Sequence, residues 1–215
     1  VFTGCLRISK ESIFTGTNNF VADTIADERF SSFFGFTDEE VRKLLENTGN
    51  LEYFDWIKKW YDGYLFGQTH VYNPWSVISY LNGVIADRIT YPRPYWANTS
   101  SNSIVREMVG EADADAKRDL ETLINGGTIE KQVHEDITYG DIHQSQDNLW
   151  NFLFFTGYLK KISERKEENK LYVTMKIPNI EIATIYEDSI SYWFDQRIKA
   201  TDRSPLREAL EAGDC

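Results

Sequence analysis

The sequence predicts an α+β fold that is predominantly α-helical and carries a short β-hairpin in its last third. Hydrophobic residues make up 41% of the 215 residues and aromatic residues 14%, which is enough to fill a real core. Several amphipathic segments begin at residues that cap helices. Two runs of alternating apolar and polar residues flank a charged turn, which is typical of a half-buried hairpin.

Charge and cysteine usage restrict the environment of the protein. The formal net charge is −11 and is spread along the chain, which disfavours a surface uniformly attractive to nucleic acid or anionic lipid. Cys5 and Cys215 lie at opposite ends, which favours a reduced, cytoplasmic protein over a disulfide scaffold. No apolar run approaches the roughly 20 residues that span a bilayer, so we expect no membrane partner.

The chain begins with a strand pattern. Residues 1–8 are rich in apolar residues and predict a buried strand, and residues 9–19 predict a polar loop. Because a protein seldom begins on a core strand, we expect this chain to be cut from a longer one.

Residues 36–145 predict a helical region. Thr37 and Glu40 match a capping box, so a first helix is expected to begin there, followed by a second amphipathic helix. The pattern breaks at Tyr61–Tyr64, and a short hairpin is expected over residues 65–72.

A third helix is expected to begin at Asn73, which caps it, and at Pro74, whose missing N–H costs nothing in the first helical position. Its predicted buried edge consists of Trp75, Ile78 and Leu81. Two more helices are expected over residues 102–112 and 115–125, the second ended by a pair of glycines.

Residues 146–200 predict a winged-helix-like module. A short apolar helix is followed by two strands, over residues 158–163 and 170–177, and then by a long final helix. The expected apolar face of that helix consists of Ile182, Tyr186, Ile190 and Trp193. Residues 201–215 are interpreted as a linker.

Several phrases of the sequence follow one another in a defined order. They are Phe2–Phe14 with Asn18 and Asn19, Phe33–Thr37, Trp60–Tyr64, Tyr72–Val77, Tyr95–Ser100, Phe155–Leu159 and Ile177–Asn179. These phrases are similar to signatures of the AAA-ATPase-like family of bacterial proteins, and the chain resembles that family over nearly its whole length. Ordered motifs of this kind are more specific together than any one alone.

The resemblance implies that the intact protein has a P-loop ATPase half, the region seen here, and often a C-terminal nuclease-like domain of the PD-(D/E)XK type. Residues 1–35 would then end the ATPase core, residues 36–145 would form a helical lid, and residues 201–215 would lead from the winged-helix-like module to the missing C-terminal domain. ATP and Mg²⁺ are the implied cofactors of the intact protein, with ATPase activity. The implied partners are the N-terminal ATPase half and the C-terminal domain.

The chain itself contains no P-loop. That motif needs a Gly-Lys pair, because glycine amides cradle the phosphate and the lysine meets its outer oxygens, and no Gly-Lys pair occurs in the sequence. His70, His134 and His143 lack the spacing of metal ligands. We therefore predict no cofactor, no metal and no catalytic residue in the isolated chain.

Arg7, Lys10 and Ser12 are the candidate nucleotide-sensing residues of the intact protein. In P-loop enzymes a polar residue just past a core strand commonly senses the terminal phosphate, and arginine stabilises the transferring phosphoryl group. The alternative is that Arg7 and Lys10 are ordinary solvated or ion-paired residues beside a strand.

The predicted wing is the most basic stretch of the chain. Its candidate nucleic-acid-binding residues are Lys160, Lys161, Arg165, Lys166 and Lys170. Phosphate contacts supply most non-specific affinity for nucleic acid, so binding would begin at these residues. The alternative is a solvated hairpin tip, because glutamates interleave with the basic residues.

Three functional hypotheses remain at this point. The leading one is a non-catalytic region that transmits nucleotide state from the ATPase half to a C-terminal effector. The second is a nucleic-acid-binding module that acts through the wing. The third is a free-standing enzyme with a pocket near Asp62 and Asn98, although Asp62 also suits an Asp-Gly turn and Asn98 a helix cap.

Overall fold

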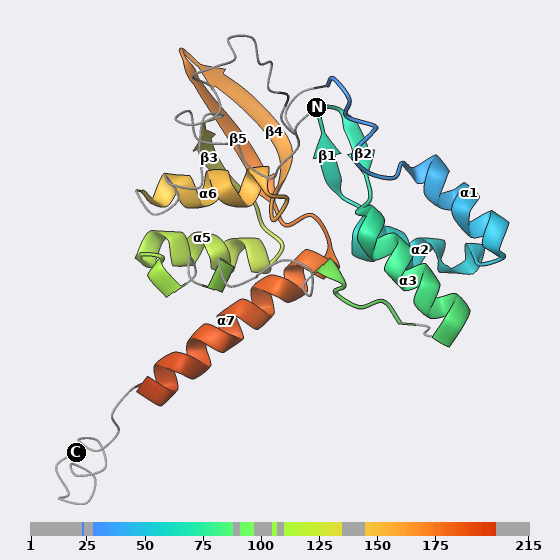
Figure 1. The fold of residues 1–215 in the computed structure, drawn as a ribbon. Coiled ribbons are helices and arrows are strands. Elements are labelled where there is room, and N and C mark those ends of the chain that lie inside the picture. The colour runs from blue at the N-terminus through green and yellow to red at the C-terminus, as the bar shows by residue number, and fades with distance from the viewer. Residues whose placement is uncertain are drawn as a thin grey trace, which may run out of the picture.

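Two hydrophobic cores organise the chain (Figure 1). The computed structural model describes residues 23, 28–87, 91–96, 105–106, 110–134 and 145–200, with side chains for all of these except residues 87, 146 and 193–200. The smaller core lies in a helical lobe formed by the first part of the described chain. The larger core lies in a lobe built around a three-stranded sheet. The chain is therefore mixed α+β, and the predicted strand over residues 1–8 falls outside the described residues.

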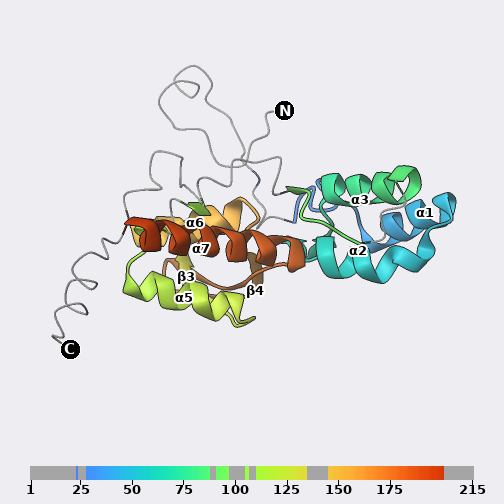
Figure 2. The ribbon, with the colours of Figure 1, turned by 90° about the horizontal axis from the view of Figure 1, so that it is seen from below.

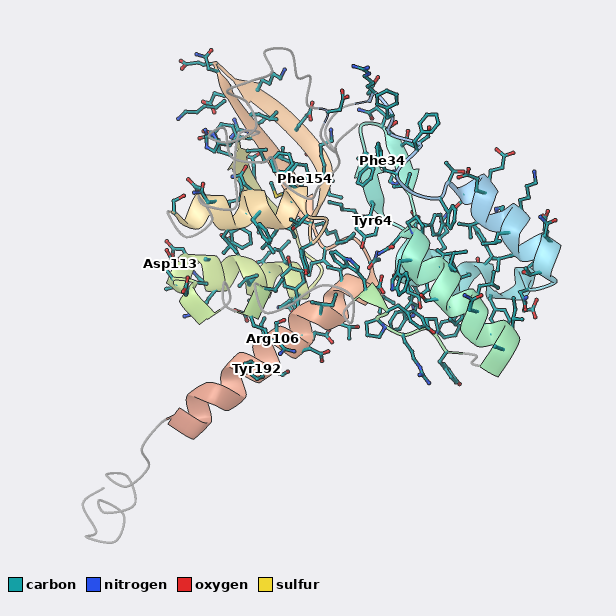
Figure 3. All side chains as sticks on the ribbon, viewed as in Figure 1. Phe34, Tyr64, Arg106, Asp113, Phe154 and Tyr192 are labelled. Atoms are coloured by element: carbon teal, nitrogen blue, oxygen red, sulfur yellow. The ribbon has the colours of Figure 1, made fainter. Side chains whose placement is uncertain are left out.

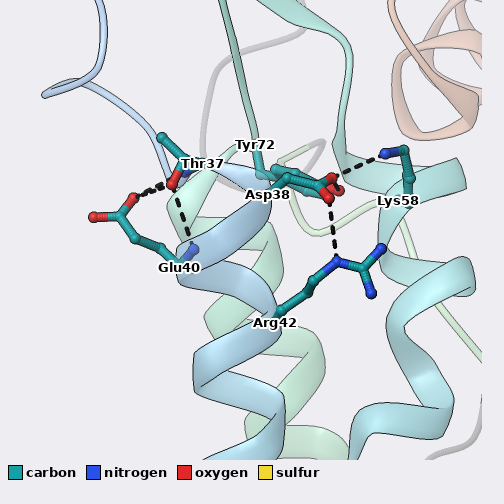
Figure 4. Close-up of polar contacts among 6 residues, drawn as sticks. All are labelled: Thr37, Asp38, Glu40, Arg42, Lys58 and Tyr72. Atoms are coloured by element: carbon teal, nitrogen blue, oxygen red, sulfur yellow. Dashed lines mark hydrogen bonds and ion pairs between the residues drawn. The ribbon is translucent and has the colours of Figure 1, made fainter.

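The helical lobe follows the predicted order of elements. It contains α1 (Asp38–Thr48), a 3₁₀ turn η1 (Leu51–Tyr53), α2 (Phe54–Tyr61), the hairpin strands β1 (Tyr64–Phe66) and β2 (Thr69–Val71), and α3 (Pro74–Asp87). The predicted capping box is confirmed: Thr37 Oγ accepts from the amide of Glu40, and the Glu40 carboxylate accepts from the amide of Thr37 at 2.9 Å (Figure 4). Gly49 ends α1 in the left-handed conformation, which suits glycine.

Asp38 links α1 to the rest of the helical lobe through hydrogen bonds (Figure 4). Its carboxylate accepts a hydrogen bond from the Tyr72 hydroxyl at 2.7 Å and from Lys58 Nζ at 2.9 Å. Partial burial acts to raise the pKa of Asp38, but the bonds from Tyr72 and Lys58 lower it overall. The ionised carboxylate therefore links α1, α2 and the end of β2.

The third helix begins where predicted but buries a different face. Asn73 Oδ1 accepts from the amide of Trp75 at 3.0 Å, as a helix cap does. Trp75 is 57% exposed and Ile78 37% exposed, so of the predicted buried edge only Leu81 is buried. The buried face consists of Ser76, Val77, Tyr80, Leu81 and Val84. The prediction was wrong because α3 carries large apolar residues on nearly every side, so their spacing does not select a face.

The second lobe contains a sheet with one strand that the sequence did not predict. Its elements are α5 (Ala114–Ile124), β3 (Ile129–Val133), α6 (Gln146–Phe155), β4 (Lys160–Glu167), β5 (Lys170–Lys176) and α7 (Ile180–Ala200). The sheet is antiparallel with the order β3-β5-β4, so the unpredicted strand β3 pairs with the second strand of the predicted wing. Helices α5, α6 and α7 pack beside this sheet (Figures 1 and 2).

The helix starts of the second lobe follow the sequence pattern. Asp113 caps α5 and Ser145 caps α6 through their side-chain oxygens. Of the helix predicted over residues 102–112, residues 105–106 and 110–112 are described, and all of them except residue 112 are helical. Arg106 lies over the ring of Tyr192 on α7, 4.7 Å from its centre (Figure 3).

The final helix turns a mixed face toward the larger core. Its buried side chains are Glu181, Ile182, Ile185, Tyr186 and Ser189. The predicted face is correct at Ile182 and Tyr186, whereas the side chain of Trp193 lies outside the described part. Among the described helices, none is both long enough and apolar enough to cross a membrane.

Candidate coupling site at the junction of the two cores

Four of the seven phrases that the sequence analysis singled out meet at the junction between the two lobes. Phrases Trp60–Tyr64 and Tyr72–Val77 come from the helical lobe, and phrases Phe155–Leu159 and Ile177–Asn179 come from the sheet lobe. Tyr64 lies between the lobes in Figure 3, and its ring lies 3.2 Å from the position that a Cβ on Gly157 would occupy. We call this junction the polar seam, because hydrogen-bonded polar groups from both lobes line it.

Gly63 allows the backbones of the two lobes to touch. Its φ of 111° lies in the region that favours glycine, and a Cβ added there would stand 2.3 Å from the carbonyl oxygen of Pro178. Next to it, Asn179 Nδ2 donates to the carbonyl oxygen of Asp62 at 2.9 Å. Asn179 also caps α7, because its Oδ1 accepts from the amide of Ile182. The Asp-Gly turn is therefore a contact between lobes as well as a turn.

Glu181 is the most deeply buried carboxylate of the polar seam. It has no exposed surface, and Ser76 Oγ on α3 lies 2.8 and 2.9 Å from its two oxygens. The amide of Trp96 donates to Glu181 Oε1 at 2.9 Å. A single side chain on α7 thus binds α3 and the segment 91–96 at the same time.

The electrostatics of Glu181 follow from this burial. Loss of hydration raises the pKa of Glu181 to about 7, and the hydrogen bonds from the Trp96 amide and Ser76 limit the rise. Burial raises the pKa of Tyr64 and of Tyr61, and the charge of Glu181 raises both further. The carboxylate changes its charge near neutral pH in a site that solvent does not reach.

Two buried polar atoms of the polar seam lack a hydrogen-bond partner among the described residues. They are Asp62 Oδ1 and the Tyr64 hydroxyl. The nearby side-chain amides of Asn73 and Asn179 lower the pKa of Tyr64 and so oppose the effect of burial, although neither makes a hydrogen bond of normal geometry with its hydroxyl. Lys160 is half-buried beside them: burial lowers its pKa, and the charge of Asp62 opposes that effect. An unsatisfied buried polar atom costs about 1–3 kcal/mol, so the seam is less stable than a fully bonded interface.

Aromatic contacts extend the seam on both sides. The rings of Trp96 and Tyr158 stack with their centres 4.7 Å apart, and the Tyr158 ring meets Tyr186 edge to face. Tyr61 exchanges two hydrogen bonds with the backbone of Arg93, at 3.0 and 3.1 Å. The segment 91–96 is therefore held between α2 and the sheet lobe.

The arrangement around Glu181 is closed to solvent and joins three segments of the chain. Both oxygens of Glu181 already accept hydrogen bonds from the protein, and its side chain has no access to an external substrate. Across the described residues, no group of three or more His, Cys, Asp or Glu side chains is placed to hold a metal ion. A movement of α7 must, however, displace Ser76 on α3 and the backbone of Trp96.

The structure separates the candidate nucleic-acid residues of the wing into two groups. Lys161 is only 9% exposed and pairs with Glu164 at 3.0 Å. Arg165 binds Glu130 on β3 at 2.8 Å and Glu167 at 2.8 Å, and these bonds raise its pKa. The half-buried Lys160 belongs to the polar seam, which leaves two of the five, Lys166 and Lys170, exposed on the hairpin without a described ion pair.

The other predicted site residues fall outside the described residues. They are Arg7, Lys10, Ser12 and Asn98. Glu181 escaped the sequence analysis because an acidic residue in the first turn of a helix ordinarily complements the helix dipole. One signal could have revealed it: Glu181 lies between Ile180 and Ile182 and four residues before Ile185, which places it on the apolar side of α7.

Comparison with curated proteins gives a distant similarity. No family model matches the chain, and no solved structure matches it. The chain is similar to an uncharacterized protein in the vnfD 5′ region of Azotobacter chroococcum mcd 1, with 28% identity over 190 residues. The aligned part covers 88% of this chain and 34% of that protein. The chain thus spans about a third of the length of the curated relative it matches.

Proposed function

We propose that this chain is the non-catalytic coupling region of a longer, P-loop AAA-ATPase-like protein. In this proposal the helical lobe is a lid that responds to nucleotide, and the sheet lobe passes the response to a C-terminal effector. The observation that carries the proposal is that the ordered sequence phrases of both lobes meet at one polar seam. A relative about two and a half times as long as this chain is consistent with further domains in the intact protein.

The order of elements in the second lobe supports the winged-helix part of the proposal. The chain runs α5-β3-α6-β4-β5, and the last strand lies in the centre of the sheet. In a winged helix a short first strand likewise pairs with the second strand of the wing. Ala116, Leu120 and Leu123 of α5 also belong to the larger core. We therefore place the start of the winged-helix-like module at α5 rather than at residue 146.

The unsatisfied atoms of the seam support a role in movement. An interface that transmits a change needs two arrangements of similar free energy. Buried polar atoms without partners keep the present arrangement from being strongly favoured. The hydrogen bonds from Ser76 and from the amide of Trp96 to Glu181 nevertheless give the present arrangement a defined geometry.

Hydrogen exchange of the intact protein tests the proposal. With ATP and Mg²⁺, exchange of the first turns of α7 should change relative to the nucleotide-free protein. Ser76→Ala should remove that change while ATP hydrolysis stays within about twofold, because the substitution breaks a bond of the seam and not of the nucleotide site. Ser189→Ala is the matched control, since Ser189 is also buried on α7 but bonds only the carbonyl of Ile185 in its own helix.

Two results would contradict the proposal. An intact protein that does not bind ATP rules out the ATPase part. An ATP-dependent protein in which the exchange of α7 does not respond to nucleotide rules out the coupling role.

A further inference from the structure

Two opposite charges in the polar seam come from different lobes and are not paired with each other. Asp62 follows α2 in the helical lobe, and its Oδ1 is buried without a hydrogen-bond partner among the described residues. Lys160 is the first residue of β4 in the sheet lobe, and its half-buried side chain forms no ion pair with a described residue. A buried polar atom without a partner is rare in a folded protein and calls for an explanation.

Lys160 lies directly beside the turn that carries Asp62. Its Nζ stands 3.2 Å from the position that a Cβ on Gly63 would occupy, so the ammonium group lies against the main chain next to Asp62. The two charges also act on one another: burial lowers the pKa of Lys160, and the charge of Asp62 opposes that effect. An acid and a base are therefore neighbours across the seam, although no ion pair joins them.

We propose that Lys160 Nζ and the Asp62 carboxylate form an ion pair in a second arrangement of the polar seam. Opposite charges attract more strongly where little water surrounds them, and the pair gives Asp62 Oδ1 the partner that it lacks. Gly63 is the joint at which the turn rotates, because glycine adopts backbone conformations that other residues rarely adopt. The inference rests on the proposed coupling role, since it describes one of the two arrangements that such a role requires.

The ion pair connects the turn of the helical lobe to the start of α7. Asn179 Nδ2 now donates to the carbonyl oxygen of Asp62 at 2.9 Å, and rotation of the turn toward Lys160 breaks this bond. Asn179 Oδ1 also accepts from the amide of Ile182, so release of Asn179 loosens the first turn of α7. The charge of Lys176, opposite Lys160 in the sheet, is unchanged by the rotation. One charged contact is thus exchanged for one neutral hydrogen bond.

A double-mutant cycle on the chain as it stands tests the ion pair. Asp62→Asn, Lys160→Met and the double variant are compared with the wild type by urea denaturation. The two substitutions should be coupled at least about fivefold in the folding equilibrium constant. The coupling should persist in about 1 M salt, because salt screens a partly buried contact pair much less than separated charges.

Lys176→Met combined with Asp62→Asn is the matched control for this cycle. Lys176 carries the same charge on the neighbouring strand, and its coupling to Asp62 should stay below about twofold. A coupling between Asp62 and Lys160 smaller than about fivefold, or one that disappears in high salt, overturns the ion pair.

Hydrogen exchange of the Ile182 amide tests the second arrangement. Lys160→Met removes that arrangement, so it should slow the exchange of this amide at least about threefold, and Asp62→Asn should do the same. Lys176→Met should leave the exchange unchanged. The measurement uses neither ATP nor the intact protein, so its failure is distinct from a failure of the response to nucleotide. Unchanged exchange in Lys160→Met overturns the proposal even where the cycle shows coupling, because the pair would then belong to the arrangement already described.

Discussion

At the scale of single residues, Glu181 links the stability of the protein to pH. Its pKa in the folded protein is about 7, above the ordinary value of 4.5. Folding therefore favours the protonated carboxyl, so the stabilisation is complete below about pH 4.5 and is lost as the pH rises through 7. Since each pKa unit corresponds to about 1.4 kcal/mol, the shift of about 2.5 units limits the loss to at most ~3.5 kcal/mol.

Glu181→Gln should remove most of this dependence. The variant resembles the protonated residue, so it should match the wild type near pH 5 and exceed its stability near pH 8. Urea denaturation at the two pH values measures the difference. Glu187→Gln is the control, because Glu187 lies on the exposed side of the same helix. A wild type whose midpoint is the same at both pH values would show that Glu181 does not titrate in this range.

Gly63 provides the second prediction at this scale. Gly63→Ala should cost about 2–4 kcal/mol, because it adds a clash with Pro178 to an unfavourable φ. Gly126→Ala separates the two causes: Gly126 also has a positive φ, but no atom lies within 4 Å of its added Cβ. That variant should cost only about 1 kcal/mol. Equal unfolding midpoints of the two variants would mean that the contact between lobes contributes nothing.

At the scale of elements, two basic residues of the wing form ion pairs within the sheet, and one of these pairs, between Arg165 and Glu130, joins β4 to β3. Arg165 and Lys161 both bind glutamates, and the order of the sheet places β4 at an edge. A charged edge strand resists pairing with other chains. The charges of β4 thus have a structural use that is separate from any ligand.

We expect from this that the chain binds no duplex DNA with measurable affinity at about 50 mM salt, where phosphate contacts are strongest. Fluorescence anisotropy with a labelled duplex measures it. If binding is seen, Lys166→Glu with Lys170→Glu should abolish it, since these two side chains are exposed. If the chain binds the duplex and the double variant does not, the result supports the nucleic-acid hypothesis.

The sequence predicted those helices and strands that are specified by residues close to one another in the chain. The capping box of α1, the Asn-Pro start of α3 and the alternation of β5 all act within a few residues, and each was recovered. Strand β3 was missed because only Ile129 and Val133 of its five residues are buried. Its stability comes from pairing with β5, about 40 residues away, which no local pattern encodes.

At the scale of the whole molecule, the candidate site was likewise predictable from the sequence only in part. The phrases could be picked out from the sequence, but their meeting point could not, because it depends on how two lobes pack. Glu181 is the clearest case: its role follows from Ser76, 105 residues earlier in the chain. The ion pair between Arg165 and Glu130 could not be predicted from the sequence either, because the register of the sheet brings β4 and β3 into reach of one another.

The whole chain should bind ATP weakly or not at all, and should not hydrolyse it, because it contains no phosphate cradle. Isothermal titration with ATP and Mg²⁺ measures the affinity. A dissociation constant in the low micromolar range corresponds to about −8 kcal/mol and would require a dedicated site in this chain. That result would show that the nucleotide contact lies here rather than in the proposed ATPase half.

The hairpin β1–β2 has a consequence for how the protein can be divided into fragments. Tyr64 and Val71 belong by sequence to the helical lobe, yet both are part of the larger core. A C-terminal fragment that starts at α5 would lose these side chains and expose the part of the larger core that they cover. Truncation at the apparent boundary between the lobes would therefore leave an open, aggregation-prone surface, and a workable expression boundary must lie before Tyr64.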